Sequence, residues 1–417
     1  MGKLLLLSGA LVAVISVLIY VTISKITEDQ EFTQTLPDFQ WGKETVGAKE
    51  DQSIKPFRIN VDQKVLDSLK KKLGEELNSG RFTPPLEGIG FHTNNSKYKK
   101  TRPLLLLHGW PGSFIEFQKI IPLLIDPKDS DINFELVIPS LPGYGYSEGA
   151  VRPGLGLVET SQIFVKLMKR LGHNKFYVQG GDWGSLIGEA MSKVYPQNLV
   201  AFHSNMCTSQ HPRSHLKTLL GSFFPSYFNT PEETERFLPF SKYFTYILRE
   251  TGYAHIQATK PDTLGVGLSQ SPTGLAAYIL EKFSGWTNPS FYEKEDGGLN
   301  AKFQLDDLLD NIMVYWVTNS ITTSVRFYSE NLSNRQRAYE LDKVPSKVPT
   351  GCIVPRWEQF IAVPKSVVED TYNNIISYTY AEDGGHFFAL EHPDVLATDF
   401  VKFSKLAEGN GDLFSGK

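Results

Sequence analysis

The sequence predicts an α/β fold in which helices cover a mostly parallel β-sheet, and three observations lead to this prediction. First, short apolar runs alternate with stretches of helical periodicity between residues 101 and 205. Second, the stretch 175–187 joins a short apolar run to a helical pattern through three glycines. Third, sheet-like segments return at 347–354 and 375–381 after a long helical insertion. Strands that alternate with helices pair in parallel, because each helix returns the chain to the same end of the sheet.

Composition limits the function classes. The chain has 417 residues, 41% of them hydrophobic, a net charge of -4 and two cysteines. An acidic balance argues against nucleic acid as a partner. Neither Cys207 nor Cys352 lies in a CxxC pair, so the sequence predicts no zinc site and no disulfide framework, and leaves one bond between the two open.

The first residues predict a membrane anchor. Leu4–Ile23 contains no charged residue and lies between Lys3 and Lys25. Twenty apolar residues in a helix match the thickness of a bilayer, and the run is longer than the apolar part of a cleaved signal peptide, which is the alternative. We therefore expect a single transmembrane helix over 4–24. Residues 25–100 then form an N-terminal arm with an amphipathic helix at 61–77, expected to pack on the main domain.

The remaining elements follow in chain order. Strands are expected at 103–107, 134–139, 175–179 and 199–203, which makes 101–205 the first part of the core. From 206 to 340 the pattern changes to aromatic-rich helices broken by Pro and Gly, which we interpret as a helical lid. The second part of the core, 341–408, holds the two late strands and a closing helix at 395–406. Loops at the carboxyl ends of the strands should then carry the active site.

The turn after the third strand has the layout of a nucleophile elbow. Gly180 and Gly184 stand two residues either side of Asp182, where a sharp strand-to-helix turn needs small residues. Esterases carry serine at that apex; an aspartate there attacks an electrophilic carbon and forms an ester. The alternative is an ordinary Gly-rich turn with a capping Asp.

Two further features agree with an elbow. The turn 108–111, His-Gly-Trp-Pro, ends the first strand, where the backbone N–H of Trp110 joins that of Trp183 in a predicted oxyanion hole. His386 follows the last strand, so that nucleophile, acid and histidine occur in hydrolase order. A simple tight turn and a surface histidine are the alternatives.

Longer motifs make a specific resemblance. The chain resembles the microsomal-type epoxide hydrolases of the α/β-hydrolase superfamily, close to the insect juvenile hormone epoxide hydrolases. The stretches that carry the resemblance are 81–87, 108–114, 180–186, 255–262, 274–283, 295–299 and 384–388. They extend over most of the chain, and the apolar amino terminus resembles that family's membrane anchor.

The resemblance implies a set of roles. Asp182 opens an epoxide while Tyr253 and Tyr328 donate a proton to the ring oxygen. His386 then activates the water that hydrolyses the ester, and Glu358 orients His386, with Glu382 and Asp383 as alternative acids. The implied partners are a lipophilic epoxide, water and membrane lipid at the endoplasmic reticulum, with no metal and no organic cofactor.

One segment departs from the family. About forty residues, which supply the first sheet strands, are expected before the His-Gly-Trp-Pro strand, whereas Gly88–Arg102 is much shorter. A loop of that length does not hold two strands and their connections. We therefore expect the first strands of the sheet to be missing and the fold to be less stable.

Two other functions stay open at this point. A haloalkane dehalogenase shares the Asp elbow and the histidine but binds halide with tryptophan indoles in place of lid tyrosines. A catalytically silent membrane protein of the same fold would use it for binding only. Asn94 and Asn331 lie in glycosylation sequons that would report on a lumenal location.

Overall fold

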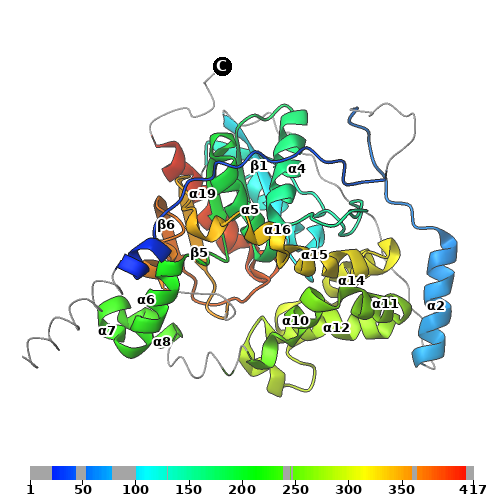
Figure 1. The fold of residues 1–417 in the computed structure, drawn as a ribbon. Helices are drawn as coiled ribbons and strands as arrows, with labels where there is room; N and C mark the ends of the chain where they lie inside the picture. The colour runs from blue at the N-terminus through cyan, green and yellow to red at the C-terminus, as the bar shows by residue number, and fades with distance from the viewer. Residues whose placement is uncertain are drawn as a thin grey trace, which may run out of the picture.

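The fold is built on a six-stranded sheet whose neighbouring strands are all parallel, as predicted (Figure 1). This computed structural model describes residues 21–43, 53–77, 100–128, 130–237, 245, 248–358 and 364–409. The strand order is β2-β1-β3-β4-β5-β6. The strands are β1 (Lys100–Leu107), β2 (Ile132–Val137), β3 (Phe176–Gly180), β4 (Leu199–Ser204), β5 (Thr350–Val354) and β6 (Ile375–Tyr380).

Helices cover both faces of the sheet. Leu105 and Leu107 pack into one apolar cluster with helices α4 (Leu157–Arg170) and α5 (Asp182–Val194). Leu104 and Leu106 point the other way, into a cluster with α3 (Ile121–Ile125) and α19 (Pro393–Glu408). The unbroken leucine run of β1 is therefore explained by burial on both sides, since successive side chains of a strand alternate between faces.

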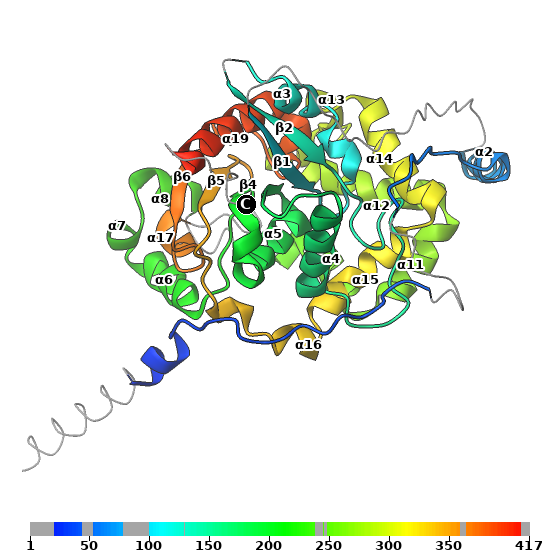
Figure 2. The same ribbon diagram turned by 90° about the horizontal axis from the view of Figure 1, so that it is seen from above.

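The predicted helical insertion divides into two groups on opposite sides of the molecule (Figure 2). The first comprises α6 (Pro212–Phe223), α7 (Pro225–Phe228) and α8 (Pro231–Phe237) and lies near α17 (Lys365–Val368) and β6. The second comprises α10 (Gly252–Thr259), α11 (Pro261–Gln270), α12 (Pro272–Gly285), α14 (Leu305–Thr318) and α15 (Ile321–Asn331). Hydrogen bonds hold α6 to α17 in the first group, and the expectation that 206–340 forms a helical lid stays a prediction.

Short helices complete the chain: α13 (Leu299–Lys302), α16 (Asn334–Arg337), α18 (Phe388–Glu391), and the 3₁₀ turns η1 (Phe114–Phe117), η2 (Pro196–Asn198), η3 (Pro289–Glu293) and η4 (Leu341–Lys343).

The amino-terminal helix α2 (Gln63–Leu77) forms as predicted but packs elsewhere than expected. It lies against α12, with Leu69 buried, and the Lys72 ammonium donates to the carbonyl of Gln270 at 3.0 Å. The sequence predicted packing on the main domain, and the contact that the structure shows for this helix is with α12 of the insertion. The arm before it crosses the core, where Val151 N–H donates to the carbonyl of Trp41.

The predicted anchor at 4–24 lies outside the described residues except for its last few, which belong to a helical turn at 21–26. Within the parts that are described, no helix has the length and apolar character needed to cross a bilayer. The predicted loss of early strands also concerns residues that are mostly not described. In the described part, β2 has β1 as its one paired neighbour.

The structure shows the contacts of the two cysteines and of the Asn331 sequon. Cys207 and Cys352 form a disulfide across 145 residues, which ties the end of β4 to β5 on either side of the insertion. The Asn331 amide donates to the Phe327 carbonyl at 2.8 Å and accepts from Leu157 N–H at 2.8 Å. Because this amide is engaged in packing, absence of a glycan at Asn331 would not report the side of the membrane. Asn94 lies outside the described residues.

Candidate active site

The turn at Asp182 has the strained geometry of an elbow. Asp182 adopts φ 48°, the left-handed region that side chains other than Gly rarely occupy. A Cβ on Gly180 would lie 2.5 Å from the backbone of Gly184, and one on Gly184 would lie 1.9 Å from the carbonyl oxygen of Leu107. Both glycines are therefore required by the close approach of β3, α5 and β1, which lifts Asp182 above the sheet.

The turn after β1 meets the Asp182 carboxylate. The backbone N–H of Trp110 donates to Asp182 Oδ1 at 2.7 Å. A Cβ on Gly109 would lie 2.2 Å from the Asp182 side chain, so this approach also needs glycine. In the described part of the chain, no hydrogen bond joins the predicted second donor, the Trp183 N–H, to this carboxylate.

His386 is brought between two carboxylates. Its Nδ1 lies 2.7 Å from Glu358 Oε2, and its Nε2 lies 3.4 Å from Asp182 Oδ2. His386 and Glu358 are both buried. Of the alternative acids, Asp383 accepts from the Trp357 indole at 2.9 Å and Glu382 is exposed, so neither lies on the His386 ring nitrogens.

The two carboxylates decide the charge of the imidazole. Burial lowers the pKa of His386, but the charges of Glu358 and Asp182 outweigh burial and raise that pKa well above 6.5. While Asp182 is ionised, His386 is therefore an imidazolium that bridges the two acids.

This raised pKa predicts a pH dependence of stability. A folded-state pKa above the unfolded value of about 6.5 stabilises the protein fully below that pH. The contribution is lost as the pH rises through the folded pKa. In urea unfolding, the stability gap between the protein and its His386→Gln variant should therefore narrow from pH 6 upward. The exposed His215→Gln serves as the control for replacing a histidine away from the site; a gap for His386→Gln that stays constant or widens contradicts this charge state.

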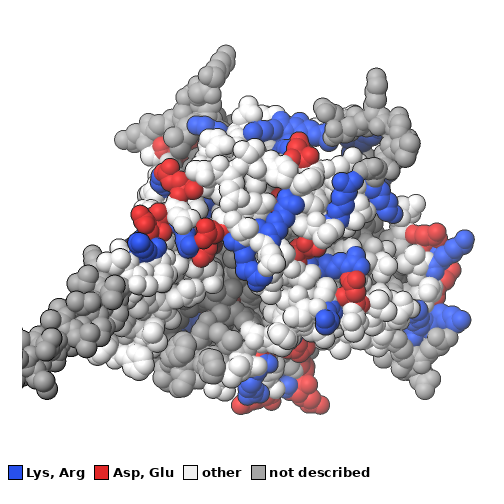
Figure 3. All heavy atoms as spheres, in the orientation of Figure 1, with Lys and Arg blue, Asp and Glu red and all other residues white. Residues whose placement is uncertain are grey.

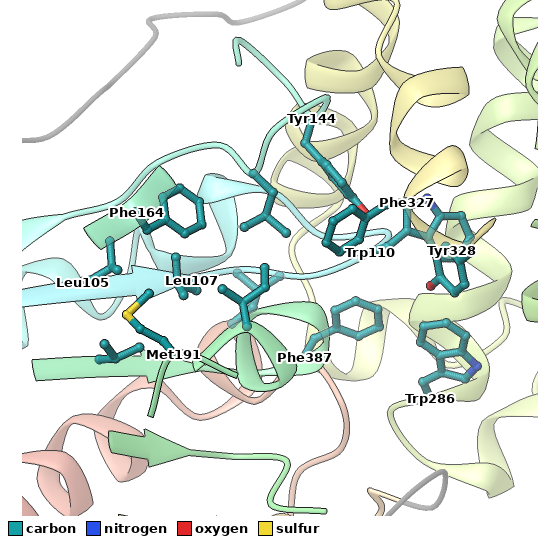
Figure 4. Close-up of a cluster of buried hydrophobic side chains, with 14 of the residues drawn as sticks. Leu105, Leu107, Trp110, Tyr144, Phe164, Met191, Trp286, Phe327, Tyr328 and Phe387 are labelled. Carbon is teal, nitrogen blue, oxygen red and sulfur yellow. The ribbon is translucent and has the colours of Figure 1, made fainter. Parts of the chain in front are cut away.

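Aromatic rings surround Trp110 from the insertion. The Tyr253 ring stacks on Trp110 at 5.4 Å and the Tyr328 ring stands edge-on to it at 5.9 Å. The two tyrosine rings are 5.9 Å apart. Figure 4 shows Tyr328 and Trp286 together beside Trp110. Burial, with a further contribution from the Asp182 charge, raises the pKa of each tyrosine well above 10, so both phenols are protonated at neutral pH.

Three residues next to this site were not predicted. On α14, the Asn311 amide donates to the carbonyl of Pro111 at 2.8 Å and the Tyr315 hydroxyl donates to the carbonyl of Gly112 at 2.7 Å. These two bonds tie the turn to α14 of the insertion, and this turn carries the Trp110 N–H. Burial raises the pKa of Glu116 to about 8, so an uncharged acid lies beneath the same turn. The sequence holds no local signal for the α14 contacts, because their partners are some two hundred residues away.

Across the ranges that the structure describes, no group of three or more His, Cys, Asp and Glu side chains is placed to hold a metal ion.

Family models match two parts of the chain. The model described as alpha/beta hydrolase fold matches residues 102–342, and the model described as epoxide hydrolase N terminus matches residues 75–117.

Individual proteins match most of the chain. Juvenile hormone epoxide hydrolase 1 of Ctenocephalides felis is 42% identical over 410 positions, covering 86% of this chain and 87% of that protein. Epoxide hydrolase 1 of Oryctolagus cuniculus is 40% identical, covering 94% of this chain and 98% of that protein. The crystal structure of juvenile hormone epoxide hydrolase from Bombyx mori superposes with a TM-score of 0.82 at 39% identity, covering 88% of this chain and 98% of that one.

The first of these alignments has more positions than the part of this chain that it covers, so the relative carries residues without a counterpart here. Sequence identity of 40–42% over 86–94% of the chain shows that it belongs to the same family as these proteins. The chain belongs to the epoxide hydrolase family, on the α/β-hydrolase fold.

Proposed function

We propose that this protein converts a lipophilic epoxide and water into a vicinal diol through an ester on Asp182. Trp110 N–H occupies Oδ1, which leaves Oδ2 as the attacking oxygen. Oδ2 bonds to a ring carbon, the ring C–O bond breaks, and the alkoxide takes a proton from Tyr253 or Tyr328. A neutral epoxide needs this acid because its leaving alkoxide is strongly basic.

Ester formation removes the negative charge of Asp182. One of the two charges that raise the pKa of His386 is then gone, so the ring releases its proton, which restores the phenol that protonated the alkoxide, and the neutral imidazole becomes a base. His386 removes a proton from water, which attacks the carboxyl carbon. The oxyanion at Oδ1 is held by the Trp110 N–H, with the Trp183 N–H proposed as second donor. Collapse breaks the bond between that carbon and the alkoxy oxygen, which takes the proton of the newly added hydroxyl and leaves as the diol, so that the Asp182 carboxylate and the His386 imidazolium are restored.

The observation that carries this proposal is the chain Glu358, His386 and Asp182, with the Trp110 N–H on the far carboxylate oxygen. Its test is one turnover with an excess of enzyme, followed by digestion and mass measurement. We expect the Asp182 peptide to gain the mass of the epoxide and then lose it as diol appears. Halide release from a haloalkane at a comparable rate would favour a dehalogenase, and no adduct would favour a silent binding protein.

The two tyrosines are expected to share the acid role. Tyr253→Phe and Tyr328→Phe should each lower kcat/KM by about 10²-fold, and the double variant by about 10⁴-fold, as removal of a general acid does. Tyr278→Phe is the matched control, because its ring also contacts Trp110, at 5.8 Å. An equal loss in Tyr278→Phe would show that ring packing rather than proton donation is measured.

The α14 contacts are expected to position the Trp110 N–H. Asn311→Leu and Tyr315→Phe each leave a buried carbonyl without its donor. We expect kcat to fall about tenfold with KM nearly unchanged, because a small displacement of the oxyanion donor affects the transition state first. Thr318→Ala removes a side-chain hydrogen bond from the end of the same helix and serves as control. A rise in KM alone would contradict this role.

The substrate class follows from chemistry and from relatives. The side chains around Trp110 are aromatic, which favours an apolar epoxide. Relatives are named for juvenile hormone epoxides or simply as epoxide hydrolases. Comparing kcat/KM for a terpenoid and an aromatic epoxide separates these two classes.

An anchored location fits such a substrate. The uncharged run Leu4–Ile23 would hold the enzyme at the membrane into which a lipophilic epoxide partitions, with the endoplasmic reticulum proposed as the compartment. Sedimentation of the full chain with microsomes after carbonate washing tests this; release into the supernatant contradicts a spanning anchor.

A further inference from the structure

The outer side of α6 and α7 is an exposed apolar surface. It carries Leu219, Leu220, Phe223, Phe224 and Tyr227, which we call the α6–α7 face. Phe223 is 71% exposed and Tyr227 is 85% exposed. The stretch 218–231 contains no charged residue, and Figure 3 shows a white surface over α7 and the end of α6. A gathering of large apolar side chains on a surface marks contact with a partner.

Helix α6 is polar on its inner side. It buries Ser214 and Gly221, and the Ser214 hydroxyl donates to the carbonyl of Val367 at 2.8 Å. Leu219 and Phe223, one helical turn apart, face outward. Burial of such side chains stabilises a folded protein, so this reversal of the usual pattern is unfavourable in water alone. An apolar medium on the outside explains it.

The residues that follow the apolar run of the amino terminus reach the core at the same corner. The helical turn at 21–26 leads to Thr27, whose carbonyl accepts from Arg213 Nη1 at 3.1 Å, and Asp29 pairs with Arg213 Nη2 at 2.6 Å. Arg213 lies at the start of α6, so Phe223 is only roughly 15 Å further along the helix axis. Both ribbon views place this turn beside α6 (Figures 1 and 2).

We propose that the α6–α7 face docks on the lipid bilayer as a second membrane contact. The inference rests on the proposed anchor: a bilayer entered by Leu4–Ile23 lies within reach of this face, because Arg213, at the start of α6, binds Thr27 and Asp29 just after that run. Phenylalanine and leucine enter the acyl boundary, and tyrosine lies at the headgroup level. Two contacts fix the orientation of the catalytic domain, which a single anchor does not do.

Spin labels in the full chain test this contact. The two native cysteines form a disulfide, so Phe223→Cys, Tyr227→Cys and the control Val266→Cys are labelled separately. Val266 is 60% exposed on α11, on the opposite side of the molecule. Each protein is reconstituted at one chain per phosphatidylcholine nanodisc, and collision with oxygen is compared with collision with a water-soluble nickel chelate.

We expect the labels at 223 and 227 to gain oxygen collisions and lose nickel collisions several-fold relative to the label at 266. Equal nickel access at all three positions overturns the inference while leaving the anchor intact. Immobilised labels without oxygen gain, which indicate a protein partner, overturn it too. Failure of the chain to enter nanodiscs overturns both the anchor and this contact, and none of these results bears on the epoxide chemistry.

Activity gives a second readout. Phe223→Ser with Tyr227→Ser should leave kcat/KM for a water-soluble epoxide unchanged and lower the rate about tenfold for an epoxide dissolved in vesicles, because less enzyme is correctly seated. Val266→Ser should change neither. An equal loss of activity with both substrates would show that the α6–α7 face is needed for folding, and would overturn the proposal.

Discussion

Asp182→Asn is expected to lower kcat/KM for every epoxide by at least about 10⁴-fold, as removal of a covalent nucleophile does. An amide oxygen does not displace an alkoxide at neutral pH. Asparagine is the informative replacement because it tolerates the left-handed φ of 48° better than alanine does. It also keeps an oxygen for the Trp110 N–H, so the fold and the turn should survive.

The measurement is the single-turnover mass experiment. Wild type should show the epoxide adduct on the Asp182 peptide, and the variant should show none. Asp383→Asn is the matched control, since Asp383 is close to His386 in sequence but is bound to the Trp357 indole. Diol formation within tenfold of wild type, with peptide mass confirming that Asn has not reverted to Asp, would rule out nucleophilic attack by this residue.

His386→Gln is expected to separate the two half-reactions. Attack on the epoxide needs Asp182 and the tyrosines, so ester should still form. Hydrolysis needs the imidazole as base, so kcat should fall by about 10³–10⁴-fold. We expect a burst of one ester per chain that persists for hours, seen as a stable mass increase of intact protein.

Glu358→Gln should also slow hydrolysis of the ester, but less than His386→Gln does. Glutamine keeps a hydrogen-bonding group near His386 Nδ1 but lacks the charge that raises the pKa of His386. Glu382→Gln, on an exposed side chain, should behave as wild type. If His386→Gln slows adduct formation and adduct breakdown equally, the imidazole serves the first step as well, and the proposed division is wrong.

Much of the fold could be predicted because its signals are local. The leucine run of β1 is buried on both faces, and its composition alone indicates such a strand. The elbow could be predicted for a similar reason. Gly180 and Gly184 are needed by backbone contacts within one turn, so their spacing predicts the geometry without knowledge of the rest of the chain.

Other features depended on which distant segments meet. Glu358, Glu382 and Asp383 all follow late strands, and only the packing of the loops brings Glu358 to the His386 ring. Asn311 and Tyr315 carry no motif, since their partners are backbone carbonyls two hundred residues earlier. Helix α2 has an apolar stripe that indicates burial but not against which helix.

The sequence by itself therefore determined the parallel sheet and the strained turn at Asp182, because backbone sterics and strand burial act over a few residues. The tertiary structure alone decided the acid partner of His386, the disulfide, the support of the Trp110 turn and the outward apolar side of α6. Each of these is a contact between segments far apart in the chain, and periodicity within one segment does not specify its partner.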